Sequence, residues 1–310
     1  MSTSVCALGS INMDFVVRAP RFAEPGETVM GDGFEQFPGG KGASQAVAAS
    51  RLGAQVSLIG CVGDDGFGSE MRGVLASEGV DITRVRLADK FPTGVGIITV
   101  VPDGEHEMIL VPGANARLSV ADVEDASGII ADAAVLLLQA DIPEEANLRA
   151  IAIAKKSNTA VVFNASPALG LNLELLREVD ILVLSRAEAY ALLGDEHSEV
   201  PATGLVRRLA SYGPDRVILT LGDEGAMDFN GEEIKTSDPH AVECIDATGA
   251  GDAFVAALAT LRAEGARVKD AVRFACAAGA LATTVAGAIP ALPTREAVEA
   301  LLKREVGATG

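Results

Sequence analysis

The sequence is poor in aromatic and basic residues. It has no tryptophan and two tyrosines among 310 residues, and 25 lysines and arginines against 43 aspartates and glutamates, which gives a formal charge of −18. The acidic residues are spread along the chain, so the sequence disfavours nucleic acids and anionic membranes as partners. A local positive site can still bind an anionic ligand.

Long apolar runs are also absent. No segment reaches the length of a membrane span, and the first residues, MSTSVCALGSINMDF, lack the basic and apolar segments of a signal peptide. We therefore expect a soluble cytoplasmic protein. The length suffices for one large α/β domain or two smaller ones.

Cysteine and histidine are too few and too scattered for a metal or hydrolase site. The sequence has no CxxC pair, no metal-ligand spacing between cysteines and the three histidines, and no G-x-S-x-G elbow. Each cysteine lies in an apolar run, so we predict reduced thiols in the core. The cysteines are Cys6, Cys61, Cys244 and Cys276.

Short apolar runs alternate with helical patterns along most of the chain, which is typical of a parallel sheet covered on both faces. The C-terminal third is mostly helical. The predicted strands are Val5–Gly9, Val56–Cys61, Val135–Gln139, Ala160–Asn164, Ile181–Ser185 and Val217–Leu221. The predicted helices are Lys41–Leu52, Gly68–Ser77, Val120–Asp132, Glu144–Lys156, Thr203–Ser211, Ala250–Ala263, Val268–Val285 and Thr294–Arg304.

Two stretches break this alternation. Residues 12–37 read as two strands, and residues 93–112 as a hairpin whose turn is Pro102-Asp103-Gly104. Strands without crossover helices do not easily extend a parallel sheet, so we predict a small separate sheet. Ligands bind at the carboxyl ends of strands in open α/β sheets, and the small sheet would be a lid there. We expect residues 1–310 to form one domain with this discontinuous lid.

The segment 246–256, DATGAGDAFVA, carries the strongest chemical signal. It follows a strand-like run, Ala241–Ile245, and opens a helix. The backbone N–H groups of Gly249–Gly251 would lie at the positive end of the helix dipole, where phosphate binds well. Asp252 beside such a cradle suits a base that takes a proton from a group attacking the phosphate. Taken alone, an aspartate that stabilises a helix start explains the pattern equally well.

A second glycine-rich loop spans residues 38–46, PGGKGASQA. It is not a P-loop, because Gly42 follows the lysine where Ser or Thr is required, and Glu35 occupies the place of the first glycine. No G-x-G-x-x-G follows the first strand, which disfavours a dinucleotide dehydrogenase. Gly39 and Gly40 would instead let the backbone approach a polar ligand at a helix start.

Together these motifs identify a family resemblance over nearly the whole chain. The chain resembles the ribokinase, or PfkB-like, family of carbohydrate kinases. The resemblance implies a three-layer α/β/α domain with a mostly parallel sheet and a small β-sheet lid. The motifs that carry it are GSINMD from Gly9, PGET from Pro25, GGKGASQAVAASRLGA from Gly39, VGDDGFG from Val62, PGAN from Pro112, LTLG from Leu219 and DATGAGDAF from Asp246.

The resemblance also assigns roles to individual residues. It implies that Asp252 is the catalytic base and that the N–H groups of Gly249, Ala250 and Gly251 form an anion hole for the transferred phosphoryl group. The residues that match sugar-binding positions of the family are Asn12, Asp14, Gly40, Lys41, Ser44 and Asp141. Asn12 and Asp14 form an i, i+2 pair on one face of a strand. Without the family resemblance, the simpler interpretation is that they are polar residues that satisfy a turn at the end of the strand.

The nucleotide and cation sites rest on the same resemblance. The residues that match nucleotide positions are Ser185, Glu188, Thr220, Gly222 and Gly225, with Glu188 acting on Mg²⁺ and phosphate. An apolar adenine pocket is expected near Val268–Val285. The residues that match a monovalent-cation site, for K⁺, are Asp246, Thr248, Ala282, Gly287 and Ala291, the last two in the loop 286–291.

Several residues depart from the family pattern. Ser44 replaces an asparagine and Asp141 a glutamate, and both changes shorten a polar side chain, which predicts either a roomier sugar pocket or a compensated ribose pocket. Ser185 replaces an asparagine, and Arg186 beside it either contacts phosphate or is a structural surface residue. Ala291 replaces a serine that supplies a cation ligand in the family, which predicts a weaker K⁺ site.

The predicted activity is phosphorylation of D-ribose to ribose 5-phosphate by MgATP. The alternatives are a related kinase for another sugar, sugar acid or nucleoside, and a sugar sensor without turnover. The scarcity of aromatic residues weakens the nucleoside alternative, because bases usually stack on an aromatic wall. Exposed edges of lid strands tend to pair with another chain, and the resemblance implies lid-to-lid contact, so we predict a homodimer.

Overall fold

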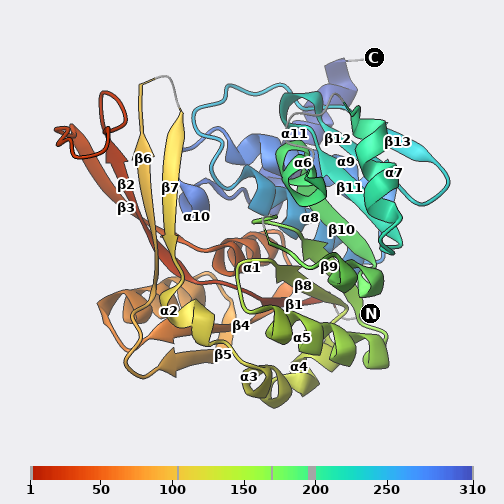
Figure 1. Ribbon diagram of the computed structural model, residues 1–310. Helices are drawn as coiled ribbons and strands as arrows, with labels where there is room; N and C mark the ends of the chain where they lie inside the picture. The colour runs from red at the N-terminus through yellow and green to blue at the C-terminus, as the bar shows by residue number, and fades with distance from the viewer. Residues whose placement is uncertain (1–2, 103–104, 169, 195–199, 309–310) are drawn as a thin grey trace.

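The computed structural model describes residues 3–102, 105–168, 170–194 and 200–308. In it the chain forms three layers and a second, smaller sheet beside them (Figure 1). The strands are β1 (Ser4–Leu8), β2 (Asn12–Arg18), β3 (Gly33–Gly39), β4 (Gln55–Gly63), β5 (Asp81–Ala88), β6 (Gly94–Val100), β7 (His106–Val111), β8 (Val135–Gln139), β9 (Ala160–Asn164), β10 (Ile181–Ser185), β11 (Arg216–Thr220), β12 (Ala226–Phe229) and β13 (Ile234–Ser237). The α-helices are α1 (Lys41–Arg51), α2 (Gly66–Ser77), α3 (Val120–Asp125), α4 (Ser127–Asp132), α5 (Glu144–Ser157), α6 (Arg186–Leu193), α7 (Ala202–Ala210), α8 (Ala250–Ala263), α9 (Val268–Ala282), α10 (Ala288–Ala291) and α11 (Arg295–Ala308).

The large sheet has the order β13-β12-β11-β10-β9-β8-β1-β4-β5, and β11 through β5 pair in parallel. Helices cover both faces of this sheet, so both faces are buried. Successive residues of the central strands point to opposite faces and therefore join two different cores. In β1, Val5 and Ala7 join the core beneath α1, α8 and α9, whereas Cys6 and Leu8 join the core beneath α5 and α7. The predicted three-layer α/β fold is confirmed.

The small sheet has the order β3-β2-β6-β7 and comes from the two stretches that break the helix–strand alternation. β2 pairs in parallel with β6, while β3 and β7 pair antiparallel at the two edges. The predicted hairpin is therefore present in β6 and β7; Asp103 and Gly104 of its turn lie outside the described residues. Figure 1 shows this sheet rising beside the large one.

Some elements differ from the sequence predictions. The predicted helix Val120–Asp132 is two helices, because the chain leaves helical geometry at Ala126 (φ −99°, ψ 5°), just before Ser127 and Gly128, which favour helices weakly. The antiparallel strands β12 and β13, strand β5 and helix α6 were not predicted. The helix α9 ends at Ala282, earlier than predicted.

The predicted strand Ala241–Ile245 is also wrong. The segment is not paired with any strand, and the amides of Ile245 and Asp246 donate instead to Thr283 O at the end of α9 (2.7 and 3.1 Å). Cys244 is consequently exposed rather than in the core, whereas the other three cysteines are buried, and all four thiols are free. In the described part of the chain, no helix has both the length and the apolar character needed to cross a membrane.

Candidate active site

The site lies where the sheet order reverses. Strand β1 has β4 on one side and β8 on the other, so the strand order reverses at β1. The loops that follow β1 and β8 therefore meet at a topological switch point. Ligands of open α/β sheets bind at such points. Ser10, just after β1, donates its hydroxyl hydrogen to Asp141 Oδ2 after β8. Its oxygen accepts the Lys41 N–H at 3.0 Å, so one hydroxyl joins three segments.

The glycine loop brings the start of α1 against this point. Gly40 precedes the helix with φ of 90°, in the left-handed region. A Cβ there would lie 2.7 Å from Asn12 N, so both the conformation and the space require glycine. The amide of Ala43 then donates to Ser10 O at 3.0 Å. Gly40 thus lies next to Asn12, and the backbone of Lys41 lies next to Ser10.

Asn12 is buried, and its side chain is oriented by Asn115. Asn115 Nδ2 donates to Asn12 Oδ1 at 2.7 Å, and Asn115 Oδ1 accepts the Ile11 N–H at 2.9 Å. A backbone N–H can only donate, which fixes the orientation of the Asn115 amide and, through it, that of Asn12. The NH₂ group of Asn12 is left to donate to a ligand.

Asp14 occupies a space that two glycines leave open. A Cβ on Gly39 of β3 would lie 2.0 Å from its carboxylate, and one on Gly96 of β6 would lie 2.4 Å from it. Burial raises the pKa of Asp14 to about 6, and a hydrogen bond from the Gly96 backbone opposes this rise. The Asp14 carboxylate is therefore confined between β3 on one side and β6 on the other.

Lys41 is the cation of the site and lies among four carboxylates. Burial lowers its pKa, but Asp252, Asp141, Glu188 and Asp14 together hold it above the ordinary value. Burial likewise raises the pKa of Asp141 to about 6, against the effects of Ser10 and Lys41. The structure thus brings together acidic residues from β2, the loop after β8, α6 and α8.

Ser44 is buried and Asp141 is half-buried, and each of these two shortened side chains is incompletely paired. Ser44 Oγ and Asp141 Oδ1 have no hydrogen-bond partner among the described residues. Buried polar atoms are normally paired, so such atoms in a site favour a ligand or water as the missing partner. Both positions keep polar atoms available although their side chains are short.

The start of α8 forms a cradle with Asp252 beside it. Gly249 precedes the helix with φ of 81°, and a Cβ there would lie 3.1 Å from Ala288 O. A Cβ on Gly251 would meet nothing within 4 Å, so space for a ligand lies above its backbone. The Ala250 N–H already donates to Ala247 O at 3.2 Å. Of the three predicted anion-hole amides, those of Gly249 and Gly251 have no acceptor among the described residues.

Asp252 itself lies in a cavity of about 180 Å³ together with Lys41 and Glu188. Burial raises the pKa of Asp252; the positive charge of Lys41 and a hydrogen bond from Gln45 oppose this, and Glu188 adds to it. A carboxyl group whose pKa is raised toward neutrality suits a general base better than an ordinary aspartate does. Ser185 and Thr220 also line this cavity.

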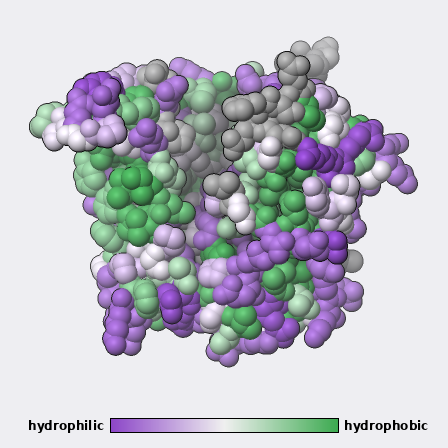
Figure 2. All heavy atoms as spheres, viewed as in Figure 1, coloured by the Kyte–Doolittle hydropathy of each residue, from purple (hydrophilic) through white to green (hydrophobic). Residues whose placement is uncertain are grey.

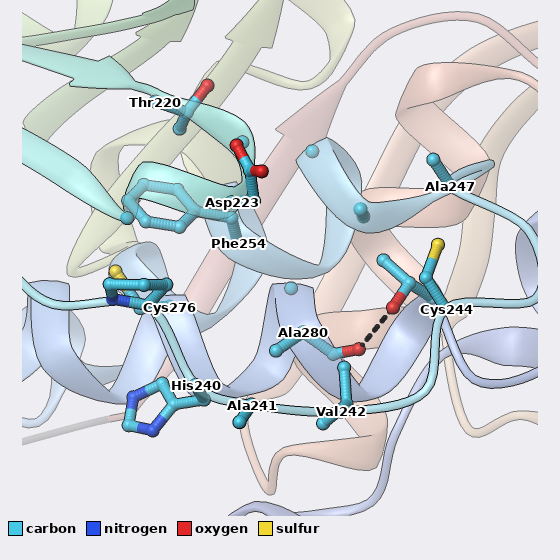
Figure 3. Close-up of a pocket in the computed structure, with 17 residues that line it drawn as sticks. Thr220, Asp223, His240, Ala241, Val242, Cys244, Ala247, Phe254, Cys276 and Ala280 are labelled. Carbon is cyan, nitrogen blue, oxygen red and sulfur yellow. Dashed lines mark hydrogen bonds between the residues drawn. The ribbon is translucent and has the colours of Figure 1, made fainter.

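A larger cavity of about 580 Å³ adjoins the smaller one, with Thr220 and Gly251 lining both. Figure 3 shows it between Thr220 and Asp223 on one side, the start of α8, and the segment from His240 to Cys244 with α9 on the other. Gly222 and Gly225 belong to its wall. Its lining is largely apolar along α9, where the adenine pocket is expected.

Ser185 and Glu188 form a capping box at the start of α6. Ser185 Oγ accepts the Glu188 N–H at 3.2 Å, and Glu188 Oε2 accepts the Ser185 N–H at 2.7 Å. The backbone N–H of Ser185 therefore holds the Glu188 carboxylate, while the serine hydroxyl caps the start of the helix. Arg186 pairs with Glu224 at 2.8 Å, next to the loop Gly222–Gly225. This ion pair does not decide between the two alternatives for Arg186, whose buried Nε has no hydrogen-bond partner among the described residues.

Asp246 connects the two loops of the predicted cation site. Its Oδ1 accepts the Thr248 N–H at 2.9 Å and its Oδ2 accepts the Gly287 N–H at 2.8 Å. Burial raises the pKa of Asp246, but these hydrogen bonds hold it below the ordinary value. Ala282 and Ala291 are buried in α9 and α10 and can offer only backbone carbonyls.

Sequence reasoning missed five polar residues of the site: Ser10, Gln45, Asn115, Gln139 and Asn164. Each is buried, and each hydrogen-bonds to a predicted site residue or to another member of this group. A signal for each of them was present in the sequence. Ser10, Gln45 and Asn115 lie within the quoted motifs GSINMD, GGKGASQAVAASRLGA and PGAN. Gln139 and Asn164 end buried apolar strands, at the sheet edge where ligands bind.

Comparison with known proteins agrees with this arrangement. A profile described as pfkB family carbohydrate kinase matches residues 2–295. The chain is 37% identical over 300 residues to the ribokinase of Haemophilus influenzae, which covers 96% of this chain and 97% of the relative.

Solved structures lead to the same family. The ribokinase of Thermotoga maritima superposes with a TM-score of 0.88 at 33% identity, covering 96% of this chain and 99% of that one. The ribokinase of Arabidopsis thaliana, solved with ribose and ATP, has a TM-score of 0.88 at 32% identity and covers 98% and 99% of the two chains. The chain therefore belongs to the pfkB family of carbohydrate kinases.

Proposed function

We propose that this kinase transfers the γ-phosphoryl group of ATP to the 5-hydroxyl of D-ribose. The observation that carries the proposal is the place of Asp252. It lies in the cavity that joins Lys41 to the cradle at the start of α8, and this cavity adjoins the larger one. The Arabidopsis relative binds ribose and ATP, which supports the same pair of substrates here.

The residues divide the chemistry among them. Asn12 donates to a sugar hydroxyl and Asp14 accepts from another, so the sugar is held with one hydroxyl toward Asp252. Asp252 takes the proton of that hydroxyl as its oxygen bonds to phosphorus, and the ADP oxygen leaves on the opposite side. The amides of Gly249 and Gly251, with Lys41, stabilise the negative charge on the phosphoryl oxygens.

Mg²⁺ fits this site as a companion of the nucleotide. Mg²⁺ in phosphoryl-transfer sites usually keeps several waters and takes its remaining ligands from phosphates and one or two carboxylates. Glu188 supplies a carboxylate at the cavity. Among the described residues, no group of three or more His, Cys, Asp or Glu could hold a metal, which agrees with an ion that arrives with ATP.

The identity of the sugar is tested by a coupled assay of ADP release. D-ribose should give the highest kcat/KM in a panel of pentoses, hexoses, sugar acids and nucleosides at equal concentrations. A hexose or sugar acid that exceeds ribose would contradict the ribose proposal and favour the roomier pocket predicted from Ser44 and Asp141. Binding of ribose without ADP release would instead identify a sensor.

We further propose that K⁺ activates the enzyme from the Asp246 site. The Asp246 carboxylate and the carbonyls of the loop 286–291 are oxygen ligands of the kind K⁺ accepts, and the Asp246–Gly287 bond ties this loop to the start of the cradle. A bound cation would therefore shape the anion hole without touching the sugar.

The expected result is a higher kcat in K⁺ than in Na⁺ or in a buffer of bulky organic cations, at equal ionic strength. Equal rates in all three would contradict the proposal. A small K⁺ effect is expected rather than a large one, because Ala291 lacks the side-chain oxygen of the family serine.

We propose that the small sheet serves as a lid and pairs with a second copy of itself. Strand register places four exposed apolar residues on the sheet face opposite Asp14, with exposures between 42% and 65%: Phe34, Ile97, Ile109 and Val111. Figure 2 shows apolar side chains gathered over this sheet. Apolar patches of this kind on soluble proteins usually mark interfaces.

Sedimentation should therefore give a dimer, and Ile109→Glu should give a monomer. Leu148→Glu is the matched control, because Leu148 is equally apolar and 43% exposed but lies on α5, away from the small sheet. A monomeric wild type would contradict the proposed dimer.

We also propose a cytoplasmic location, which the four free thiols favour.

A further inference from the structure

A chain of buried amides lies behind the catalytic carboxylate. Gln139 Nε2 donates to Gln45 Oε1 at 2.7 Å, and Gln45 Nε2 donates both to Asn164 Oδ1 at 3.0 Å and to Asp252 Oδ1 at 2.8 Å. Gln45 and Gln139 are completely buried, and Asn164 is nearly so. The chain joins α1, β8, β9 and α8, which are far apart in sequence.

The direction of these hydrogen bonds is fixed by the backbone. Asn164 Nδ2 donates to Val183 O at 3.2 Å, and a carbonyl can only accept, so the Asn164 oxygen must face Gln45. Gln45 must therefore present its NH₂ group on this side. One N–H goes to Asn164 and the other to Asp252, so the contact with Asp252 is a donated hydrogen bond.

We propose that Gln45 is a positioning residue for catalysis, which holds Asp252 Oδ1 and leaves Oδ2 to take the proton of the sugar hydroxyl. This inference rests on the proposed function. Gln45 acts through Asp252 and need not touch the substrate.

The charges around Asp252 show why an amide suits this role. Lys41 favours the ionised carboxylate of Asp252, whereas burial and Glu188 oppose it. Burial raises the pKa values of Asp14 and Asp141, and the charge of Asp252 in turn adds to this rise. A second cation would favour ionisation too, but it would also attract the phosphoryl group away from the cradle. A neutral N–H donor stabilises and orients the carboxylate without adding a competing charge.

The test is Gln45→Met, which keeps the length of the side chain and removes the N–H. We expect kcat to fall on the order of 10- to 100-fold, because small displacements of a catalytic group have effects of this size. The KM values for sugar and ATP should stay unchanged, and the acid limb of the kcat–pH profile should move to higher pH. Thr260→Val is the matched control, because Thr260 is buried on α8, the helix that carries Asp252, and its hydroxyl has no partner among the described residues.

A second readout does not depend on turnover. The ¹³C carboxyl resonance of Asp252, assigned by its loss in Asp252→Asn, should titrate at higher pH in Gln45→Met than in wild type. If Gln45→Met does not fold, Gln139→Met is the second variant. It removes the hydrogen bond from Gln139 Nε2 to Gln45 Oε1, so Gln45 is held less firmly, and kcat and the titration should change in the same direction.

An unchanged kcat and an unchanged titration would overturn the role of Gln45. A drop in kcat with an equal rise in both KM values and no change in titration would also overturn it, because that pattern indicates general loosening. Failure of the proposed function is distinguishable, since wild type itself would then release no ADP with any sugar.

Discussion

Asp252→Asn is expected to lower kcat by about 100- to 10,000-fold, the range that general acid–base catalysis contributes. Asparagine has nearly the same shape, and its oxygen can still accept the Gln45 N–H, so the fold and the neighbouring hydrogen bonds should persist. What is lost is an acceptor for the proton of the sugar hydroxyl. Affinities for sugar and ATP should therefore remain close to those of wild type.

Calorimetric titration with ribose and ADP release in a coupled assay separate these two effects. Gln45→Met provides a graded comparison, because it displaces the base without removing it. Turnover in Asp252→Asn at the wild-type rate would show that another group takes the proton, and the assignment of the base would be wrong.

Lys41→Gln should have the second largest effect, a fall in kcat/KM of about 100- to 1000-fold, similar to the loss of one donor from an oxyanion hole. Two causes act together. The phosphoryl group loses a positive partner, and the carboxylates of Asp14, Asp141, Asp252 and Glu188 lose the cation that offsets their mutual repulsion. The pKa values of Asp14, Asp141 and Asp252, which burial already raises, should rise further, so the variant should be most impaired below neutral pH.

The control for Lys41→Gln is Lys269→Gln, which makes the same change of charge at an exposed position on α9. If both variants lose activity equally, the effect comes from overall charge and not from the site. The pH dependence of kcat/KM gives the second check: a Lys41→Gln profile parallel to that of wild type would contradict the proposed coupling to the carboxylates.

The fold was predictable where periodicity and length agree. The buried strands β8, β9 and β10 and the helix α8 begin and end at the predicted residues. The edge hairpin of β12 and β13 was missed, because its strands are only four residues long and one of them is mostly exposed. Such short segments carry too little pattern to distinguish a strand from a loop.

The segment before the cradle shows a different limit. Ala241–Ile245 alternates like a strand, yet its last amide bonds to the end of α9, and Cys244 faces the cavity instead of the core. Alternation reports which side chains face apolar surroundings. It does not report whether a neighbouring strand is present to pair with.

At the site, the motifs contain Asn115 and Gln45 as well as the reacting groups, but the sequence assigns a role only to the reacting groups. Asp252, Lys41 and Asp14 follow from the family resemblance. The orientation of Asn12 depends on Asn115, more than one hundred residues away, and that of Asp252 on Gln45, more than two hundred residues away. Contacts over such separations leave no local pattern in one sequence.

The two glycines around Asp14 have a consequence for engineering. Gly39 and Gly96 come from different strands, and a methyl group at either one would occupy the volume of the Asp14 carboxylate. A library that randomises the residues around the sugar should therefore keep these two positions as glycine, since a side chain at either one would displace the Asp14 carboxylate. New substrate preferences should be sought at Ser44 and Asp141, where polar atoms still lack partners and the wall can be rebuilt without displacing Asp14.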